Sequence, residues 1–425
     1  MDFDICGGNV YIDGEFKKRN LSVRDGFIVG IFSGVPADAA DTVFQLNNCF
    51  IFPGFLDVHV HLREPGFSYK ETIETGTLAA AHGGFTSVCA MPNLSPVPDC
   101  ADNLRVQREI IDRSARVRVY PYGSITRGQA QRELSDMEEL AREVIAFSDD
   151  GVGVASAEMM ERAMVKAKAL GKMIVAHCEI PELTRGGFLH DGAYARAHGF
   201  IGNPSESEWR MIERDLELVA KTLCNYHICH VSARESVELI RRAKAAGLPV
   251  SCETAPHYLL LCDEDLRDDG AFRMNPPIRG RADREALVEG IIDGTIDMIA
   301  TDHAPHSPEE KAGGLAGSLN GIVGLETAFP ALFTGLVKPG TLGLTRLLEL
   351  MQSEPARRFG IGNRLAIGEK ADLTVFDLER EFTIEPEGFL SKGRSTPFGG
   401  MKVFGKCLLT AVGGEIVHIE QNSCK

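Results

Sequence analysis

The middle of the chain alternates short apolar runs with longer segments in which apolar residues recur every three or four positions. Short apolar runs bounded by turn residues are typical of buried strands, and the longer periodic segments are typical of amphipathic helices. The apolar runs predict strands at residues 55–62, 85–92, 117–125, 144–149, 173–178, 225–231, 249–255 and 296–301. The segments between them predict helices, for example at residues 71–82, 157–170, 207–223, 234–246 and 283–293.

A strand followed by a helix, repeated along the chain, indicates the α/β class. Eight such units predict a (β/α)8 TIM barrel, in which parallel strands close into a ring inside a layer of helices. An open, doubly wound parallel sheet is the alternative fold. The chain has no GxGxxG or GxxxxGK[ST] motif to support a nucleotide-binding form of that sheet.

Both ends of the chain have another pattern, in which short strands are separated by turns. Asp-Gly pairs such as Asp25-Gly26 are typical of hairpins, and residues 366–425 continue this style. Because chain termini often lie close together, we expect residues 1–52 and 366–425 to form one small β-sandwich domain. Residues 53–365 then form the barrel.

Composition and net charge limit the kinds of binding partner and the cellular location that we expect for this protein. The 425 residues are 44% hydrophobic and carry a net charge of −15, which argues against nucleic acid or an anionic membrane as a partner. An anionic small-molecule substrate would need local cations. The 11 cysteines form no CxxC pairs, and the N-terminus resembles no signal peptide. We therefore expect reduced core thiols, no membrane segment and a cytoplasmic protein.

The most informative polar motif follows the first predicted barrel strand, where one residue separates His59 from His61. Side chains two apart on a strand project from the same face, so both imidazoles can reach one metal ion. Arg63 has the same parity and places a cation beside that ion. These three residues predict metal-assisted hydrolysis of a substrate that carries a carboxylate.

Polar residues also follow other predicted strands, at the ends where the reactive groups of such barrels lie. Asn93 follows the second strand, and either Asp149 or Asp150 could bind metal after the fourth. With one of these aspartates, four histidines and two aspartates would meet on one rim, enough for two zinc ions that share a carboxylate. The candidate ligands are His59, His61, His177, His230, Asp302 and either Asp149 or Asp150.

A lone histidine at a strand end is more often a hydrogen-bonded structural residue than a ligand. Six candidates at separate strand ends favour the metal site over that alternative. His227 has the wrong parity relative to His230 and is expected to face the helices. His82 and His418 resemble surface or packing residues. His257 follows the seventh strand and could reach the rim, although a loop-stabilising role is favoured.

Other candidates have ordinary structural alternatives. Arg63 could be a surface arginine, although its position favours bidentate binding of a substrate carboxylate. Asn93 and Asn275 both lie next to prolines and could be turn residues. The glycine-rich segment 307–324 predicts a flexible rim loop that could act as a lid, and its Glu309-Glu310-Lys311 run is expected to be solvated.

Several motifs together resemble the dihydroorotases of the amidohydrolase superfamily, in particular the bacterial type I enzymes of pyrimidine biosynthesis. The similarity covers nearly the whole chain and rests on GFLDVHVHLREPG at 54–66, MPN at 91–93, MNPPIR at 274–279 and ATDHAPH at 300–306.

This resemblance implies a TIM barrel with a small composite β domain and two zinc ions. It implies that His59, His61 and Asp302 hold one metal ion, and that His177 and His230 hold the other. Many superfamily members bridge their metals with a carboxylated lysine after strand 4, where this chain has Asp149-Asp150-Gly151. A dihydroorotase subgroup uses the second aspartate instead, which assigns the bridge to Asp150.

The implied reaction is the reversible cyclisation of N-carbamoyl-L-aspartate to L-dihydroorotate, with Asp302 as the catalytic proton acceptor. Relatives carry Pro-Phe-Gly in the rim loop, where this chain has Leu319-Asn320-Gly321. Arg63, Asn93 and His306 would hold the substrate carboxylate. The full set of implied substrate contacts is His61, Arg63, Asn93, Asn275, His306, Asn320 and Gly321.

The resemblance also implies a homodimer and an association with aspartate transcarbamoylase. One alternative is another cyclic amidase, a hydantoinase or allantoinase, but those enzymes usually have the bridging lysine and need no carboxylate-binding arginine. A second alternative is a catalytically silent homologue that assembles with aspartate transcarbamoylase. Silent homologues typically lose metal ligands, and this chain keeps all six candidates.

Overall fold

The computed structural model describes residues 1–34, 39–362 and 364–420. Its central feature is a ring of parallel strands that pair in the orders β6-β7-β8 and β14-β13-β12-β9. Seven of the eight predicted barrel strands form: β6 (Phe55–Val60), β7 (Phe85–Ala90), β8 (Arg118–Pro121), β9 (Ile174–Ala176), β12 (Tyr226–Ile228), β13 (Val250–Thr254) and β14 (Met298–Ile299).

The predicted strand at 144–149 is the exception, because it makes only single bridges to its neighbours. Phe147 pairs with Gly123 on one side and with Ile174 on the other. A further bridge between Val60 and His303 joins the segment after the last barrel strand to the first barrel strand. These bridges close the ring and confirm the TIM barrel.

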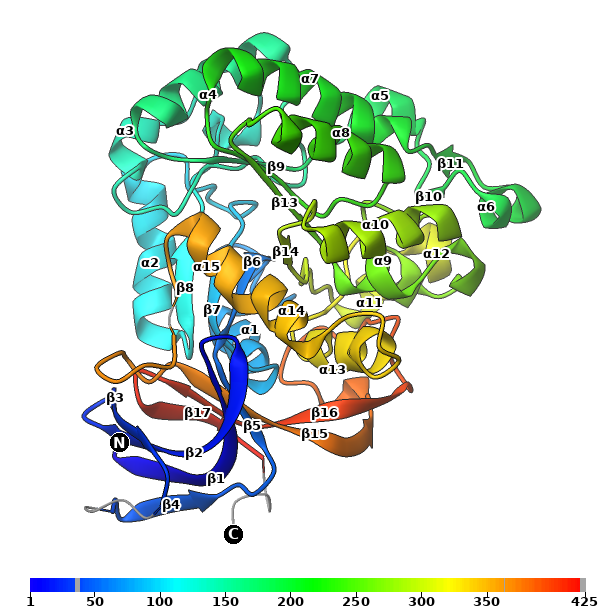
Figure 1. Cartoon of the computed structure of the whole chain (residues 1–425). Helices are drawn as coiled ribbons and strands as arrows, with labels where there is room; N and C mark the ends of the chain where they lie inside the picture. Colours follow the sequence, from blue (N-terminus) through cyan, green and yellow to red (C-terminus); the bar gives the residue numbers. More distant parts are fainter. Residues whose placement is uncertain (35–38, 363, 421–425) are drawn as a thin grey trace.

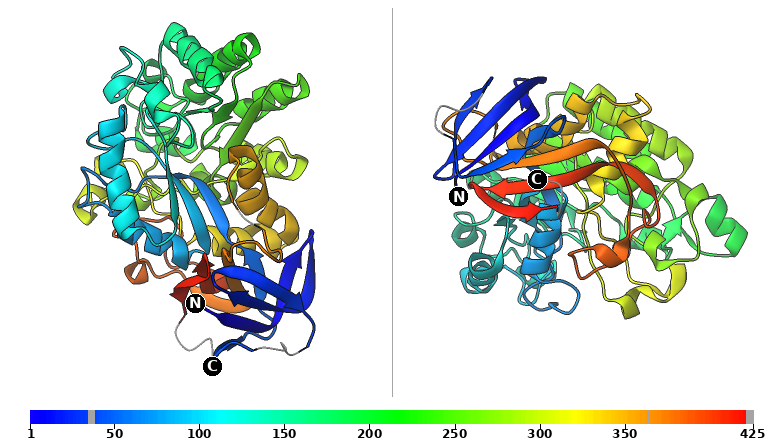
Figure 2. Two further views of the ribbon diagram at one scale, coloured as in Figure 1. Left: turned by 90° about the vertical axis from the view of Figure 1, so that its left-hand side faces the viewer. Right: turned by 90° about the horizontal axis from the view of Figure 1, so that it is seen from below.

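Helices surround the ring, as Figures 1 and 2 show. In α7, the buried Ile212, Asp215, Leu216 and Val219 recur at helical spacing and face the barrel. The longer helices are α1 (Ile73–His82), α2 (Ala101–Ser114), α4 (Ala157–Ala169), α7 (Glu206–Thr222), α8 (Arg234–Ala245) and α10 (Arg281–Asp293).

Shorter elements complete the helical layer and the rim. Between the rim segment and the C-terminal strands lie α13 (Ala328–Leu332), α14 (Leu344–Leu348) and α15 (Glu354–Phe359). The others are α3 (Met137–Leu140), α5 (Pro181–Thr184), α6 (Ala193–His198), α9 (Pro256–Leu260), α11 (Pro308–Lys311), α12 (Gly314–Gly317), β10 (Leu189–His190) and β11 (Gly202–Asn203).

The two ends of the chain form a second sheet, in the order β17-β16-β15-β5-β1-β2-β3 with β4 beside β1. In Figure 2 the blue N-terminal strands lie next to the orange and red C-terminal ones. This sheet confirms the composite β part, while the domain limits after residues 52 and 365 stay a proposal. Its strands are β1 (Phe3–Ile12), β2 (Glu15–Arg24), β3 (Phe27–Phe32), β4 (Thr42–Gln45), β5 (Phe50–Pro53), β15 (Leu373–Thr383), β16 (Lys402–Val412) and β17 (Glu415–Ile419).

A cluster of phenylalanines joins this sheet to the barrel. The Phe329 ring lies 4.3 Å from that of Phe376 in β15, 5.3 Å from Phe55 in β6 and 5.8 Å from Phe52 in β5, between ring centroids. Phe329, Phe52 and Phe55 are completely buried. Aromatic packing of this kind couples the two parts of the molecule.

Within the described residues, no helix combines the length and the hydrophobicity that a membrane crossing requires. Every cysteine in that part of the chain is a free thiol, and most are buried. The expectation of reduced core thiols therefore agrees with the structure.

Replacing Phe329 with alanine should lower the free energy of unfolding by about 3–5 kcal/mol, because it opens a cavity where three aromatic rings meet. Denaturant unfolding of the purified protein measures this loss. Ile367→Ala is the control, since this side chain is 65% exposed and its loss should change stability by less than about 0.5 kcal/mol. Equal effects of the two substitutions would contradict the proposed junction.

Candidate metal centre and active site

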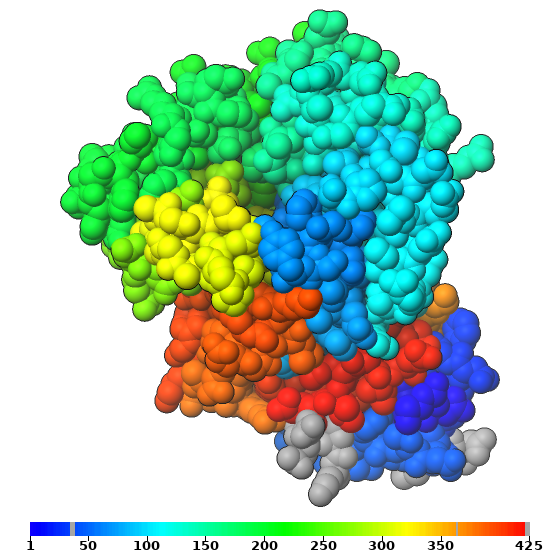
Figure 3. Space-filling view, turned by 180° about the vertical axis from the view of Figure 1, so that it is seen from behind, coloured from blue at the N-terminus to red at the C-terminus, as the bar shows by residue number. Residues whose placement is uncertain are grey.

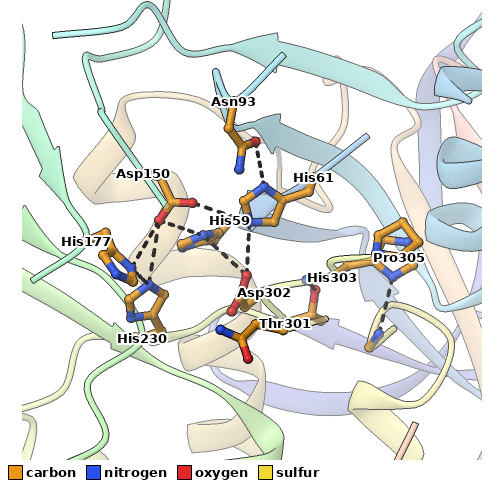
Figure 4. A network of polar contacts seen from close by, with 12 residues as sticks. His59, His61, Asn93, Asp150, His177, His230, Thr301, Asp302, His303 and Pro305 are labelled. Carbon is orange, nitrogen blue, oxygen red and sulfur yellow. Dashed lines mark hydrogen bonds and ion pairs between the residues drawn. The ribbon is translucent and has the colours of Figure 1, made fainter. Parts of the chain in front are cut away.

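The six predicted metal ligands converge at the carboxyl ends of the barrel strands (Figure 4). They come from positions far apart in the chain, and the closed ring brings them together. All six are at least nine-tenths buried: His59, His61, Asp150, His177, His230 and Asp302.

The first group of ligands surrounds Asp302. Its Oδ1 lies 3.1 Å from His61 Nε2 and 3.5 Å from His59 Nε2. Because both histidines present Nε2 to the same oxygen, the two imidazoles point to one position, as the strand parity predicted.

The second group surrounds Asp150, whose carboxylate lies between all four histidines. Its Oδ1 is 3.4 Å from His59 Nε2, 3.6 Å from His230 Nε2 and 3.7 Å from His177 Nδ1. Its Oδ2 is 3.4 Å from His61 Nε2. Oδ1 thus faces three of the histidines and Oδ2 faces the fourth, so the Asp150 carboxylate lies between the two predicted groups of ligands, where a bridging ligand would lie.

These residues fit a divalent cation. His59 Nε2 and Asp150 Oδ1 are buried and have no hydrogen-bond partner among the described residues, although they lie 3.4 Å apart. Buried polar atoms are rarely left in this state. Imidazole nitrogens and carboxylate oxygens are the donors that zinc and similar ions prefer.

Hydrogen bonds behind the ligands determine which ring nitrogens face the metal position. His59 Nδ1 lies 2.6 Å from Glu253 Oε1, and His61 Nδ1 lies 2.8 Å from Asn93 Oδ1. Both rings therefore donate a hydrogen bond from Nδ1–H. This leaves the lone pair of Nε2 available to coordinate a metal ion. Burial raises the pKa of Glu253, but His59 and His227 outweigh it and lower that pKa to about 2.

The expectation that His227 faces the helices is wrong. Its Nε2 lies 2.9 Å from Glu253 Oε2, inside the barrel below the ligands. The parity argument fails because β12 ends at Ile228 and His230 adopts a φ of 33°, which breaks the alternation between them.

Only Asp150 of the adjacent aspartates reaches the ligands. Asp149 Oδ1 instead accepts hydrogen bonds from the backbone N–H groups of Ile125 and Thr126, at 2.8 and 3.1 Å. Asp149 thereby connects the irregular fourth barrel segment, at residues 144–149, to the loop after β8. This connection orients the adjacent Asp150.

Three functional candidates have a left-handed backbone: Arg63 with a φ of 60°, His230 with 33° and Asp302 with 49°. Non-glycine residues rarely adopt this conformation, and such strain gathers at functional sites. The surrounding barrel holds these side chains where an extended strand would not place them.

Comparison with known proteins gives the family that the sequence motifs resemble. A family model described as "Dihydro-orotase-like" matches residues 49–236. A protein named dihydroorotase from Bacillus cereus (strain AH820) is 50% identical over 414 residues, which cover 97% of this chain and 96% of that protein. A dihydroorotase from Bacillus caldolyticus is 50% identical over 408 residues, or 95% and 96% of the two chains. The chain belongs to the dihydroorotase family.

Solved structures agree on the fold. An L-hydantoinase (dihydropyrimidinase) from Arthrobacter aurescens has a TM-score of 0.88 at 26% identity and covers 98% of this chain and 96% of its own. A dihydropyrimidinase from Brevibacillus agri has a TM-score of 0.87 at 23% identity and covers 100% and 96%. Together with the dihydroorotases, these neighbours identify the chain as a cyclic amide hydrolase.

A cavity of about 190 Å³ opens above the ligands of this dihydroorotase-family site. It lies on the rim where the segment with α11 and α12 (yellow in Figure 3) meets the segment after β6 (blue). Every predicted substrate contact lines it: His61, Arg63, Asn93, Asn275, His306, Asn320 and Gly321.

Arg63 is the cation of this cavity. Its Nε donates to the backbone oxygen of Pro305 at 3.1 Å, and it makes no ion pair with a carboxylate of the described residues. Its Nη2 lies 3.4 Å from His306 Nε2, which already donates to the backbone oxygen of Asn320 at 2.8 Å. The guanidinium therefore has donors available for a ligand.

The rim segment is more ordered than a glycine-rich loop would be, because it contains α11 and α12. The prediction that Lys311 is solvated is wrong. Its Nζ is buried and donates to the backbone oxygens of Gly321, Leu319 and Arg273 at 2.7, 2.8 and 3.0 Å. The packing of these three carbonyls around one ammonium group decides its position.

Gly321 has a structural reason to be glycine. Its φ is 136°, and a Cβ there would lie 2.5 Å from the backbone oxygen of Ala304. The rim loop therefore approaches the strand-end segment closely enough to present its backbone to the cavity.

Two acidic residues of the site are not among the residues that the sequence patterns predicted. Glu253 is the buried partner of His59, and Glu179 Oε2 accepts from Asn275 Nδ2 at 3.2 Å. An acidic residue inside an apolar strand was the available signal for Glu253. For Glu179 it was a position two residues after His177.

His306 should make the protein less stable in acid. Burial, and then Arg63 and Lys70, lower its pKa to about 4, against 6.5 for an ordinary histidine. Between these pH values the unfolded chain binds a proton that the folded protein does not. The free energy of unfolding therefore decreases as the pH is lowered from 6.5 to 4. The full difference corresponds to roughly 3 kcal/mol.

His306→Gln should therefore reduce the loss of unfolding free energy between pH 7 and pH 4, measured by denaturant titration at each pH. His198→Gln, at an exposed histidine, is the control and should keep the slope of the unchanged protein. An identical pH profile for His306→Gln would contradict the assignment.

Proposed function

We propose that this protein is a dihydroorotase that interconverts N-carbamoyl-L-aspartate and L-dihydroorotate, with loss of water on cyclisation, in de novo pyrimidine (UMP) biosynthesis. The observation that carries the proposal is the guanidinium of Arg63, which has no carboxylate partner among the described residues and lies in the cavity above six buried ligands. Both substrates carry a carboxylate that this group would bind.

We further propose two zinc ions per subunit, bridged by Asp150. His59, His61 and Asp302 would hold one ion, and His177 and His230 the other. Bound zinc would supply Lewis acidity, which lowers the pKa of water toward about 7 and polarises an amide carbonyl.

Asp302 is proposed to move the proton. Burial raises the pKa of its carboxyl, but His59 and His61 outweigh burial and keep that pKa well below the ordinary value. Because this carboxylate is ionised, it would accept a proton from the attacking water and pass it to the departing ring nitrogen. In the synthetic direction it accepts the proton of the carbamoyl nitrogen.

The remaining residues would bind and orient the substrate. Arg63, Asn93 and His306 hold its carboxylate, with the guanidinium as the bidentate partner. Asn275, held by Glu179, contacts the edge of the ring. His61 and the backbone of Asn320 and Gly321 complete the cavity wall.

The competing functions have weaker support. Hydantoinases share the fold at 26% identity or less, whereas the relatives named dihydroorotase are 50% identical. A hydantoinase also has no use for Arg63, because hydantoin lacks the carboxylate. A catalytically silent homologue would be expected to lack ligands, and here all six converge.

Three further proposals rest on the family. They are a homodimer, an association with aspartate transcarbamoylase, and a cytoplasmic location. The net charge of −15 accords with a small-molecule enzyme that binds neither nucleic acid nor membranes.

Asp302→Asn should reduce kcat in both directions by about 10²–10⁴-fold, because the amide cannot accept the proton. Zinc content by mass spectrometry should change little, since the amide oxygen still reaches the same position. Asp191→Asn, at an exposed aspartate, is the control. Near-normal turnover by Asp302→Asn would refute the proton transfer.

Arg63→Met should lower kcat/KM for dihydroorotate by about 10–100-fold, the value of a charge-assisted hydrogen bond. Arg132→Met, at an exposed arginine, is the matched control and should change nothing. The unchanged enzyme should also prefer dihydroorotate to hydantoin, which has no carboxylate. A preference for hydantoin, or an unaffected Arg63→Met variant, would overturn the proposed substrate.

A further inference from the structure

A second cluster of metal-ligating side chains lies far from the active site. His82 is the last residue of α1, and His418 and Glu420 lie at the end of β17 (Figure 1). α1 leads into the start of β7, so the cluster is at the opposite end of the barrel from the six rim ligands. We propose that His82, His418 and Glu420 bind one divalent cation of the zinc class.

The geometry allows one ion to reach all three residues. One ligand atom of each lies within 4.8 Å of the others, and all three side chains are partly buried. The two imidazole rings have centroids 4.8 Å apart. Two imidazoles and a carboxylate are a donor set that zinc accepts, with a fourth position left for water.

His82 is already oriented as a metal ligand would be. Its Nδ1 lies 2.6 Å from Glu326 Oε1, so the ring donates there and its Nε2 stays free. Glu326 is held in turn by the backbone N–H groups of Leu390 and Ser391, at 2.9 and 3.3 Å. This carboxylate–histidine arrangement repeats the one between Glu253 and His59.

His418 supplies the independent observation. Its Nε2 is buried and has no hydrogen-bond partner among the described residues. A buried imidazole nitrogen without a partner is available to coordinate a cation.

The charges around the cluster limit its affinity. Glu420 Oε1 lies 3.2 Å from Arg380 and its Oε2 lies 3.7 Å from Lys406, so two cations already share this carboxylate. Glu326 adds a second negative charge on the other side. We therefore expect weaker binding than at the rim, where no lysine or arginine forms an ion pair with the described ligands.

Room for the ion's water is present beside the cluster. A cavity of about 170 Å³ is lined by His82, Glu326, Lys406 and Cys407, among others. The bound ion would connect the end of α1 to the last strand of the composite sheet. Its role would be structural, since it fastens the C-terminal strand to the barrel.

Anomalous diffraction at the zinc edge, on crystals of the whole protein soaked with zinc, tests the proposal directly. We expect a peak between His82 and His418 in addition to any at the rim. Absence of that peak at millimolar zinc overturns the proposal. The rim peaks report separately on the metals of the proposed enzyme, so the two outcomes are distinguishable.

Zinc titration in solution provides the second test. His418→Ala should bind one zinc ion fewer per chain than the unchanged protein, and its Tm should rise less when zinc is added. His82→Gln should do the same if His418→Ala folds poorly, and activity should persist in both. His198→Ala is the control at an exposed histidine. Equal zinc stoichiometry in all four proteins overturns the proposal.

Discussion

The active site depends on one buried carboxylate. Asp150 lies among four imidazoles, with one of its oxygens and the facing His59 Nε2 both lacking hydrogen-bond partners. Burying such groups without compensation is costly, and a cation between them removes most of that cost. The barrel therefore presents a site whose stability and chemistry both call for metal. Glu253 and Asn93 hold the imidazoles so that the free nitrogens point inward.

A second constraint is backbone strain at the rim. Arg63, His230 and Asp302 all have a positive φ, which the chain would not adopt in an isolated strand. Packing in the closed barrel and in the loops above it offsets this backbone strain. The predicted metal ligands and the guanidinium of Arg63 are thereby held in a fixed relative position. In a protein with a net charge of −15, that local cation would allow an anionic substrate to bind, as we propose.

The composite sheet completes the molecule at the other end. A buried phenylalanine cluster joins it to the barrel through Phe52, Phe55, Phe329 and Phe376. The proposed ion at His82 and His418 would act at a neighbouring connection, between α1 and β17. Distant ends of the chain would then be held together both by apolar packing and by coordination.

Local patterns in the sequence were sufficient for the strand–helix repeat, the parity of His59 and His61, and the motifs that resemble dihydroorotases. These features depend on residues a few positions apart. The choice of Asp150 over Asp149 and the inward position of His227 depend on partners more than 20 residues away, or on a break in strand geometry. The burial of Lys311 depends on the backbone oxygens of Leu319, Gly321 and Arg273, which the folded rim segment brings together around it. Only the tertiary structure decided them, because hydrogen bonds across the barrel outweigh local parity and polarity.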